Sequence, residues 1–387
     1  MRILVTTNAL VSHFLPLMPI AQKMKERGHD VRVAAVPELG AEIRKHGFDH
    51  LEFNGWTDPE FEDLNRRAQK VRREDEGKLF MSQFFMGLAA RSAIPGLLTE
   101  LEKWRPDLLF RESTEFAGLI AAKKLGIHHV RFEIVNGESE ESIASNYATE
   151  MDALRTSVSL PAIGEGYLRD EPALSAHPKV LDDTMRINSR EPYRFRTSAL
   201  PKVPVAGRPE WLLDRNVPLV YMTFGTVTAG EGRARHIYDA SLKAVANLPI
   251  TVLMTTGKDA PPDLIKNVPE NVVVRDFVDQ AWVLNYVDLM VCHGGSGTVL
   301  GGLAAGVPMI VVPMFADQPD NARCLAAAGL SITVEDQDIG MLGSRILDVL
   351  NAPERKMAAE QAADEFSRLP TLDDALTECT TVLAAKN

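Results

Sequence analysis

The stretch VDLMVCHGGSGTVLGGLA at residues 287–304 is the most informative segment of the sequence for its architecture. Val287–Cys292 is apolar and short enough for a buried strand, and a helical pattern follows the glycine-rich run HGGSGT at 293–298. A strand that leads through glycines into a helix presents backbone N–H groups and the positive end of the helix dipole to an anion. The run is neither the G-x-G-x-x-G fingerprint nor a G-x-x-x-x-G-K-[ST] loop. We therefore expect an anionic ligand in the C-terminal half.

Strand-like segments alternate with helical patterns on both sides of the chain's midpoint. In the first half we expect strands at Ile3–Thr7, Val31–Val36, Leu51–Phe53, Leu108–Phe110 and Val130–Ile134. In the second half we expect strands at Leu219–Thr223, Thr251–Thr255, Val272–Arg275, Leu289–Cys292 and Met309–Val312. Such alternation is typical of parallel sheets covered by helices on both faces. We predict an α/β architecture of two doubly wound, Rossmann-like parallel-sheet domains that face each other across a cleft.

A connector rich in proline separates the two halves. Residues 192–218 show little periodicity and contain Pro192, Pro201, Pro204, Pro209 and Pro218. We predict a first domain over 1–200, a linker over 201–217 and a second domain over 218–387. The last helix, at about 370–387, is a candidate for packing back on the first domain.

Composition narrows the function classes. A net charge of -11 and a pI near 5.4 argue against a nucleic-acid partner, which would require a basic face. The three cysteines are far apart and indicate free thiols in a reducing cytoplasm. We see neither signal-peptide anatomy nor an apolar stretch of membrane-spanning length, so we expect a cytoplasmic protein with no membrane partner. A homodimer is the commonest oligomeric arrangement, but the sequence does not decide the oligomeric state.

A histidine follows the first predicted strand. The turn Thr7–His13 lacks glycines, so it cannot hold a pyrophosphate as the first turn of a Rossmann domain does. In a doubly wound sheet the fourth strand lies beside the first, so Glu112, which follows Leu108–Phe110, should arrive beside His13. A carboxylate bound to one imidazole nitrogen makes the other a general base for a hydroxyl proton. Two alternatives stay open: His13 only caps the next helix, or Glu115 is the partner.

Strand ends in the second half carry groups that suit a phosphate. Gly225 and Thr226 follow the first strand of this half, where the threonine can donate to a phosphate oxygen. His293 can donate a ring N–H, and Ser296 and Thr298 can add hydroxyl and backbone donors. Taken alone, each of these features is also common at ordinary turns.

Two further segments of the second half admit a structural and a functional interpretation. Phe277 follows a predicted strand and could stack on a base or fill the core. Asp317 and Gln318 precede a predicted helix and could cap it or hold sugar hydroxyls near the bound phosphate.

Together these motifs resemble glycosyltransferases of the GT-B fold, in particular bacterial enzymes that glycosylate macrolide, polyketide, enediyne and related antibiotic aglycones. The resemblance covers nearly the whole chain. It is carried by MRILVTTNALVSHFLPLMPIAQKMKERGHDVRVAA at 1–35, RPDLLFRESTEFAG at 105–118, MTFGT at 222–226 and, most specifically, the run from RDFVDQ to DQPDNA at 275–322. It implies an inverting, metal-independent transfer of a sugar from a nucleotide donor, with no other cofactor.

The resemblance also assigns roles to individual residues. His13 corresponds to the base on the acceptor hydroxyl and Glu112 to the acid that orients it, although many relatives carry Asp there. Phe277 corresponds to the residue that stacks on the nucleobase, and the backbone of Val278 to the group that reads the base edge. The residues that correspond to the diphosphate cradle are Thr226, His293, Ser296, Gly297 and Thr298, with Gly225 and Gly295 beside them. Asp317 and Gln318 correspond to the pair that faces the sugar.

One departure from the family concerns the donor. Relatives that use a UDP-sugar often place Glu eight residues after the motif histidine, where it holds the ribose hydroxyls, but this chain has Gly301 there. A 2′-hydroxyl would lose its partner at this position, so we expect a TDP-sugar as the co-substrate.

The expected acceptor is a hydrophobic small molecule bound by the first domain. Its pocket should use the 55–90 region and the 136–185 loops, with Phe80, Phe84, Phe85 and Met86 as apolar candidates, although their helical spacing also suits a core. We expect no metal site, because no acidic D-x-D pair is placed to bind one. Two other functions stay open: a nucleotide-sugar 2-epimerase and a catalytically inactive auxiliary binding protein.

Overall fold

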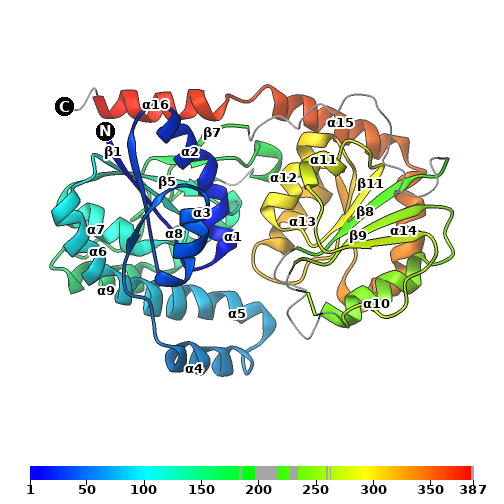
Figure 1. The fold of residues 1–387 in the computed structure, drawn as a ribbon, viewed down its shortest axis with the longest axis horizontal. Helices are drawn as coiled ribbons and strands as arrows, with labels where there is room; N and C mark the ends of the chain where they lie inside the picture. The colour runs from blue at the N-terminus through cyan, green and yellow to red at the C-terminus, as the bar shows by residue number, and fades with distance from the viewer. Residues whose placement is uncertain (183–184, 197–215, 226–233, 259, 262, 385–387) are drawn as a thin grey trace. The chain divides into compact units, whose positions relative to one another are not determined.

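The computed structural model describes the chain apart from residues 183–184, 197–215, 226–233, 259, 262 and 385–387. The described chain divides into two compact units, each built on one parallel sheet (Figure 1). The first unit comprises Met1–Ala176, Asp183–Phe195 and Pro370–Asn387, and the second comprises His177–Asp182 and Arg196–Leu369. The predicted pair of parallel-sheet α/β domains is confirmed.

The first unit has a seven-stranded sheet in the order β3-β2-β1-β4-β5-β6-β7. Its strands are β1 (Arg2–Thr6), β2 (Asp30–Ala35), β3 (Asp49–Glu52), β4 (Leu108–Glu112), β5 (His128–Glu133), β6 (Ala173–Ser175) and β7 (Tyr193–Arg194). The chain order reverses between β1 and β4, which pair in parallel with Ile3 opposite Leu108. Ligands of doubly wound sheets bind at the carboxyl ends of the strands at such a reversal, so β1 and β4 mark the place for a site.

The first unit also contains helices. They are α1 (Val11–Phe14), η1 (Leu15–Leu17), α2 (Met18–Glu26), η2 (Pro37–Leu39), α3 (Gly40–Lys45), α4 (Asp58–Ala68), α5 (Arg73–Leu79), η3 (Phe80–Ala89), α6 (Ala90–Trp104), α7 (Phe116–Leu125), α8 (Gly137–Asn146), α9 (Ala148–Ser157) and α16 (Leu372–Ala384). The helix-rich stretch that the sequence predicted for 55–105 is present, and its middle part, η3, is a π-helix. Much of the 136–185 region is not loop as expected, because α8 and α9 lie within it.

The second unit has a six-stranded sheet in the order β10-β9-β8-β11-β12-β13. Its strands are β8 (Leu219–Thr223), β9 (Thr251–Thr255), β10 (Val272–Arg275), β11 (Leu289–Cys292), β12 (Met309–Val311) and β13 (Ser331–Thr333). Its helices are η4 (Lys179–Leu181), α10 (Ala234–Val245), α11 (Gln280–Val283), α12 (Ser296–Ala305), α13 (Gln318–Ala327), η6 (Asp336–Met341), α14 (Leu342–Leu350) and α15 (Pro353–Ser367). The sequence missed β13 in this unit and β6 and β7 in the first unit, because these strands have only two or three residues each.

The two units differ from the predicted domains at their boundaries. Residues 177–182 belong to the second unit, and the first unit reaches Phe195 rather than residue 200. The C-terminal segment from Pro370 belongs to the first unit, where Arg27 Nη2 of α2 lies 3.0 Å from Asp373 Oδ1 of α16. Most of the predicted linker, 201–217, lies outside the described residues.

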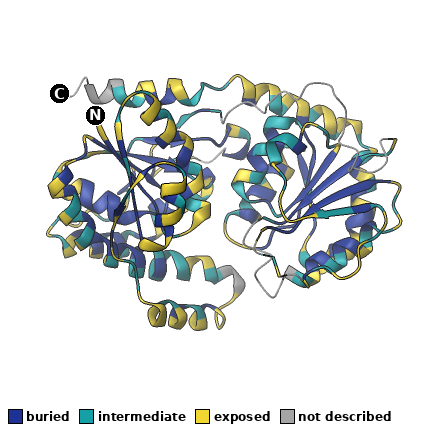
Figure 2. Ribbon diagram, viewed as in Figure 1, coloured by how far each residue is buried: buried dark blue, intermediate teal, exposed yellow. Residues whose placement is uncertain are grey.

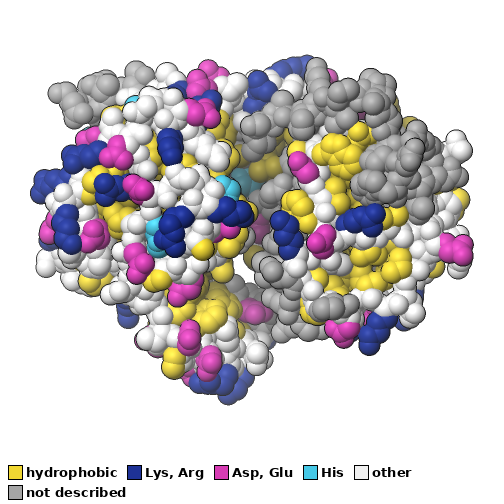
Figure 3. Space-filling model, viewed as in Figure 1, with side chains coloured by type: hydrophobic (Ala, Val, Ile, Leu, Met, Phe, Trp, Pro, Cys, Tyr) yellow, Lys and Arg dark blue, Asp and Glu magenta, His cyan; other side chains and the backbone are white. Residues whose placement is uncertain are grey.

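Each unit has its own core between sheet and helices. Figure 2 shows the strands almost wholly buried, whereas most helices have one buried and one exposed face. This is the pattern that apolar strands and amphipathic helices produce when the helices cover both faces of a sheet. On the face seen in Figure 3, basic and acidic side chains are interspersed. None of the described helices combines the length and apolarity that a membrane span requires.

A network of charged side chains lies inside the first unit. The Arg111 guanidinium donates to both oxygens of Glu171, at 2.7 Å and 2.5 Å. Arg131 lies 3.2 Å from Glu171 and from Glu133 and 3.3 Å from Glu140. All five side chains are 0% exposed. Because a buried charge is costly unless it is paired, each member depends on the others.

We expect Glu171→Gln to lower the free energy of unfolding by about 3 kcal/mol, because it leaves two buried guanidinium groups without their shared carboxylate. Urea denaturation followed by circular dichroism measures the change. Glu26→Gln is the matched control, because it breaks the exposed Lys23–Glu26 pair and should cost less than about 0.5 kcal/mol. Equal losses in the two variants would contradict the structural role of the network.

Candidate functional site

The carboxyl ends of β1 and β4 bring His13 and Glu112 together. His13 lies in α1, just beyond the turn that follows β1, and Glu112 is the last residue of β4. His13 Nδ1 lies 3.2 Å from Glu112 Oε1. The His13 side chain is 16% exposed and that of Glu112 is 0% exposed, so a ligand could reach the imidazole but not the carboxylate. The predicted contact is present, and the catalytic roles of the two residues stay predictions.

Two further side chains hold the Glu112 carboxylate, and the sequence analysis missed both. Asn8 Nδ2 donates to Glu112 Oε1 at 2.7 Å and to Thr114 Oγ1 at 2.8 Å. The Thr114 backbone N–H donates to Glu112 Oε2 at 2.6 Å, and the Thr114 hydroxyl lies 3.1 Å from His13 Nδ1. Asn and Thr are ordinary residues at turns, so their types carry no functional signal. Their positions beyond the ends of β1 and β4 are the only signal that the sequence offers.

The electrostatics of the pair favour an ionised carboxylate. Burial alone would raise the pKa of Glu112, but the electrostatic interaction with His13 and hydrogen bonds from His13 and Thr114 hold this pKa below its usual value. An ionised carboxylate only accepts, so the contact with Glu112 requires the proton on Nδ1 of His13. Nε2 then carries the lone pair, and it has no hydrogen-bond partner among the described residues. The arrangement can therefore act as a general base.

The buried network fixes the backbone that carries Glu112. Arg111 Nη1 donates to the carbonyl oxygens of Glu112, Ser113 and Glu115 at 3.0, 3.1 and 3.2 Å. The other guanidinium nitrogens of Arg111 are held by Glu171. The hydrogen bonds of the buried Arg111 thus hold the turn after β4 in place. They thereby set the position of the Glu112 carboxylate beside His13.

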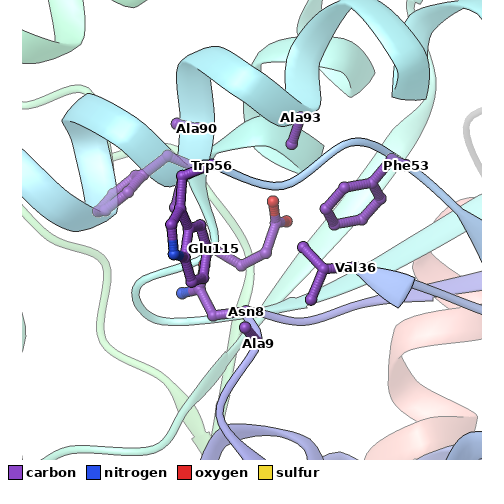
Figure 4. A pocket seen from close by; sticks show the side chains of 10 residues that line it. Asn8, Ala9, Val36, Phe53, Trp56, Ala90, Ala93 and Glu115 are labelled. Carbon is purple, nitrogen blue, oxygen red and sulfur yellow. The ribbon is translucent and has the colours of Figure 1, made fainter. Parts of the chain in front are cut away.

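Glu115, the alternative partner of His13, has a different place. It is the N-cap residue of α7, where its carboxylate accepts from the Gly118 N–H at 2.8 Å and from the Thr6 hydroxyl at 2.6 Å. Burial raises the pKa of Glu115 against these hydrogen bonds. Its carboxyl group points into a cavity of about 10 Å³, large enough for about one water (Figure 4). The cavity is lined by Asn8, Ala9, Val36, Phe53, Trp56, Ala89, Ala90, Ala93, Glu115 and Phe116.

The four apolar candidates for acceptor binding divide into two pairs. Phe84 and Met86 are buried, at 3% and 1% exposure, and belong to the interior of the first unit. This agrees with the alternative that their helical spacing suits a core, and it corrects the expectation that they face an acceptor. Phe85 is half-buried and stacks on His13, with ring centroids 5.6 Å apart and planes inclined by 21°. Phe80 is half-buried and contacts Phe84 edge-on.

In the second unit the run HGGSGT connects β11 to α12, as the sequence predicts. Gly294 has φ +89°, and a Cβ there would lie 2.7 Å from Val311 Cγ1. A Cβ on Gly225 would come within 2.8 Å of His293 Nε2, and one on Gly295 within 2.5 Å. The imidazole is therefore packed against two bare backbone segments, one after β8 and one after β11. Larger residues at either glycine would displace it.

His293 is neutral at physiological pH. Burial lowers its pKa to about 4, and a backbone hydrogen bond with Thr223 opposes this effect only in part. The buried Nδ1 atom has no hydrogen-bond partner among the described residues. A neutral imidazole has one N–H donor, so His293 can donate to a phosphate oxygen, without adding a charge of its own, only when this N–H leaves the Thr223 backbone.

Polar side chains meet at the start of α12. The Ser296 hydroxyl donates to Asp317 Oδ2 at 2.7 Å, and Asn321 Nδ2 donates to the same oxygen at 2.8 Å. Asp317 stands at the N-cap position of α13, but its side chain makes no capping bond. Gln318 is buried, and its side-chain oxygen accepts from the backbone N–H groups of Met314 and Phe315. Gln318 thus stabilises the preceding turn, while Asp317 faces the phosphate motif.

The remaining donor candidates follow different strands of the second sheet. Gly297 is exposed and Thr298 half-buried in the first turn of α12, and Thr226 lies outside the described residues. Phe277 is 54% exposed, so it does not fill the core. Lys258 Nζ lies 4.5 Å from the centre of the Phe277 ring, and Val278 beside it is half-buried. An exposed aromatic face at a strand end is available for stacking.

Two family models match the chain. The model described as erythromycin biosynthesis protein CIII-like, N-terminal domain, matches residues 22–155, and the model of the C-terminal domain of the same protein matches residues 239–382. The two matches fall in the two halves that carry the two groups of site residues.

Named relatives extend this similarity over the whole length. The aklavinone 7-beta-L-rhodosaminyltransferase of Streptomyces galilaeus is 26% identical over 96% of this chain and 93% of its own. The elloramycin glycosyltransferase ElmGT of Streptomyces olivaceus is 28% identical over 97% of this chain and 95% of its own. A crystal structure of the glycosyltransferase VinC in complex with dTDP has a TM-score of 0.78 and 23% identity and covers 100% of both chains. The last similarity confirms the GT-B fold.

Proposed function

Because the chain belongs to the erythromycin biosynthesis protein CIII-like family of antibiotic glycosyltransferases, we propose that it moves a deoxysugar from a TDP-sugar to a hydroxyl of an apolar natural-product aglycone. The observation that carries the proposal is the contact of 3.2 Å between His13 Nδ1 and the buried Glu112 carboxylate. It supplies the base that a single displacement at the anomeric carbon needs.

In the proposed reaction His13 Nε2 removes the proton of the acceptor hydroxyl. The acceptor oxygen forms a bond to the anomeric carbon as the bond from that carbon to the diphosphate oxygen breaks. Attack from the face opposite the diphosphate inverts the anomeric configuration. Glu112 stabilises the imidazolium that forms, because its buried carboxylate already binds the Nδ1–H. The proton leaves His13 for solvent once the glycoside departs.

The leaving diphosphate gains negative charge, which the second unit would stabilise. No side-chain cap closes the N-terminus of α12 among the described residues, so its first backbone N–H groups after Gly295 can face an anion. His293 can add its one ring N–H when this group leaves the Thr223 backbone. Because these donors are fixed before the reaction, they need no reorganisation as charge develops. This set supports our proposal that the reaction needs no metal ion.

The surroundings of His13 favour an apolar acceptor. Leu10, Val11 and Leu15 flank the histidine in sequence and are exposed at 42%, 47% and 44%. Phe85 adds an aromatic face against the imidazole. Large apolar side chains are seldom grouped on a surface without a partner, so an aglycone with few polar groups would suit this region.

The donor specificity that we propose rests on Gly301. A Cβ on Gly301 would lie 2.1 Å from Gln280 Nε2, so the Gln280 amide occupies the space that a longer side chain at 301 would need. Gln280 Nε2 donates to the Thr298 carbonyl at 3.2 Å, which holds it there. This position therefore has no carboxylate that could bind a ribose 2′-hydroxyl. Its absence supports a donor whose nucleotide contains 2′-deoxyribose, such as a TDP-sugar.

The comparisons lend no support to the two other functions that the sequence left open, a nucleotide-sugar 2-epimerase and an inactive auxiliary protein. We propose that the enzyme acts in the cytoplasm, in keeping with its three cysteines, which are free. Its proposed partners are the donor and the acceptor, without nucleic acid or membrane. We also propose a homodimer, only because dimers are the commonest oligomers of soluble proteins.

We expect His13→Ala to lower the rate of sugar transfer by about 10²–10⁴-fold, because a general base contributes that much. The affinity for TDP should stay unchanged, since no donor residue is altered; steady-state kinetics and calorimetry measure the two quantities. His46→Ala is a matched control, because His46 Nε2 also lies 3.2 Å from a carboxylate, Glu42, in the same unit. Unchanged turnover in His13→Ala would remove the pair from the mechanism.

We expect TDP to bind at least tenfold more tightly than UDP in calorimetric titrations, because the ribose 2′-hydroxyl of UDP loses its solvation without gaining a partner. The double variant Gly301→Glu, Gln280→Ala restores a carboxylate and clears the space for it. This variant should reduce the preference for TDP, whereas Gln280→Ala alone should not. Tighter binding of UDP by the unaltered protein would contradict the proposed donor.

A further inference from the structure

A short segment from the first half of the sequence completes the donor-side unit. Residues 177–182 belong to the second unit, although Ala176 just before them belongs to the first. The segment includes η4 and is anchored by Leu181, which is 1% exposed. His177 at its start is also 1% exposed. We expect a buried imidazole to have a hydrogen-bond partner, because burying a polar group without one costs free energy.

That partner is the serine of the phosphate motif. His177 Nε2 lies 3.0 Å from Ser296 Oγ, whose hydroxyl also lies 2.7 Å from Asp317 Oδ2 and 3.3 Å from Asn321 Nδ2. A serine hydroxyl has one proton to donate and two lone pairs with which to accept. Its proton goes to the Asp317 carboxylate, which only accepts. Both lone pairs are then used, one by the ring N–H of His177 and one by the Asn321 amide.

The three hydrogen bonds of the Ser296 hydroxyl limit how it can bind a nucleotide-sugar. The hydroxyl cannot donate to a phosphate oxygen while it donates to Asp317. Rotation about the Cβ–Oγ bond can turn the proton from Asp317 to the phosphate without moving the oxygen. The proton then takes the place of the longer contact of 3.3 Å with Asn321, and the accepted bond from His177 keeps Oγ in place. When the proton turns away, Asp317 Oδ2 gains an acceptor position, with Asn321 still bound at 2.8 Å.

We propose that His177 is a positioning residue of the donor site. It holds the Ser296 oxygen while the serine proton turns from Asp317 to the donor diphosphate, and the released Asp317 oxygen then accepts from a hydroxyl of the sugar. Binding of the diphosphate thereby prepares the place for the sugar. The inference rests on the proposed function, because it requires a nucleotide diphosphate in this unit.

His177 contributes more to this arrangement than Asn321 does. Asn321 Nδ2 donates to the Gly294 carbonyl and to Asp317 at 2.8 Å each, whereas its distance to Ser296 is 3.3 Å. The shorter contact of 3.0 Å from His177 is therefore the main restraint on the Ser296 oxygen. Without it, the side chain could rotate about χ1 and carry its hydroxyl away from the phosphate.

A double-mutant cycle with TDP and TDP-glucose as probes tests the proposal by calorimetry. His177→Phe keeps a ring but removes the donor, and Ser296→Ala removes the hydroxyl that it holds. We expect either substitution to weaken TDP about tenfold, in line with the loss of one hydrogen bond to a charged group. In the Ser296→Ala background, His177→Phe should add less than twofold, because its effect passes through Ser296. His177→Gln, which offers an N–H at a similar reach, should stay within about threefold of the unaltered protein.

Ser331→Ala is the matched control, because Ser331 is a buried serine of the same unit whose hydroxyl has no partner among the described residues. It should leave the affinity for TDP unchanged. Effects of His177→Phe that add fully to those of Ser296→Ala would overturn the proposal, as would unaltered TDP affinity in His177→Phe. A failure of the unaltered protein to bind either probe would instead overturn the proposed function itself. The two failures are therefore distinguishable.

Discussion

A fully buried carboxylate beside an imidazole is the constraint on which the first unit's chemistry depends. Removing the Glu112 carboxylate from water is costly, so the structure surrounds it with donors from Asn8, Thr114 and His13. Glu112 and the Thr114 hydroxyl in turn contact Nδ1 of the imidazole and fix its orientation. Arg111, held in turn by Glu171, clamps three carbonyl oxygens of the turn that carries Glu112. The proposed base is thereby oriented before any acceptor arrives.

The second unit achieves its chemistry by a different physical route. Its proposed anion site depends on close packing rather than on charge, because glycines at 225 and 295 let the backbone approach His293 closely. The imidazole is neutral, so the site offers directed donors and a helix terminus instead of a cation. Such donors stabilise the negative charge that develops on a leaving group during the reaction. The two units thus supply the two halves of one proposed displacement.

Local patterns in the sequence predicted what depends on periodicity and strand order. The alternation of strands and helices was enough to place β1 beside β4 and therefore Glu112 beside His13. Contacts between distant segments could not be predicted in this way. His177 lies 119 residues from Ser296, and neither residue type announces the other. The helices α8 and α9 were missed because their polar composition resembles that of a loop, and Phe84 and Met86 could be assigned to the core only once η3 was seen.

The stereochemistry of the product is the decisive observable for the proposed displacement. The protein would be incubated with TDP-sugars and a panel of apolar hydroxylated aglycones in the presence of excess EDTA, and NMR would give the anomeric configuration of any glycoside. A single displacement by an activated hydroxyl predicts a glycoside with the configuration opposite to that of the donor, formed at the same rate with or without the chelator. A product that retains the donor configuration would contradict a single displacement by the acceptor hydroxyl. A product that forms only with a divalent metal would contradict a reaction without a metal ion.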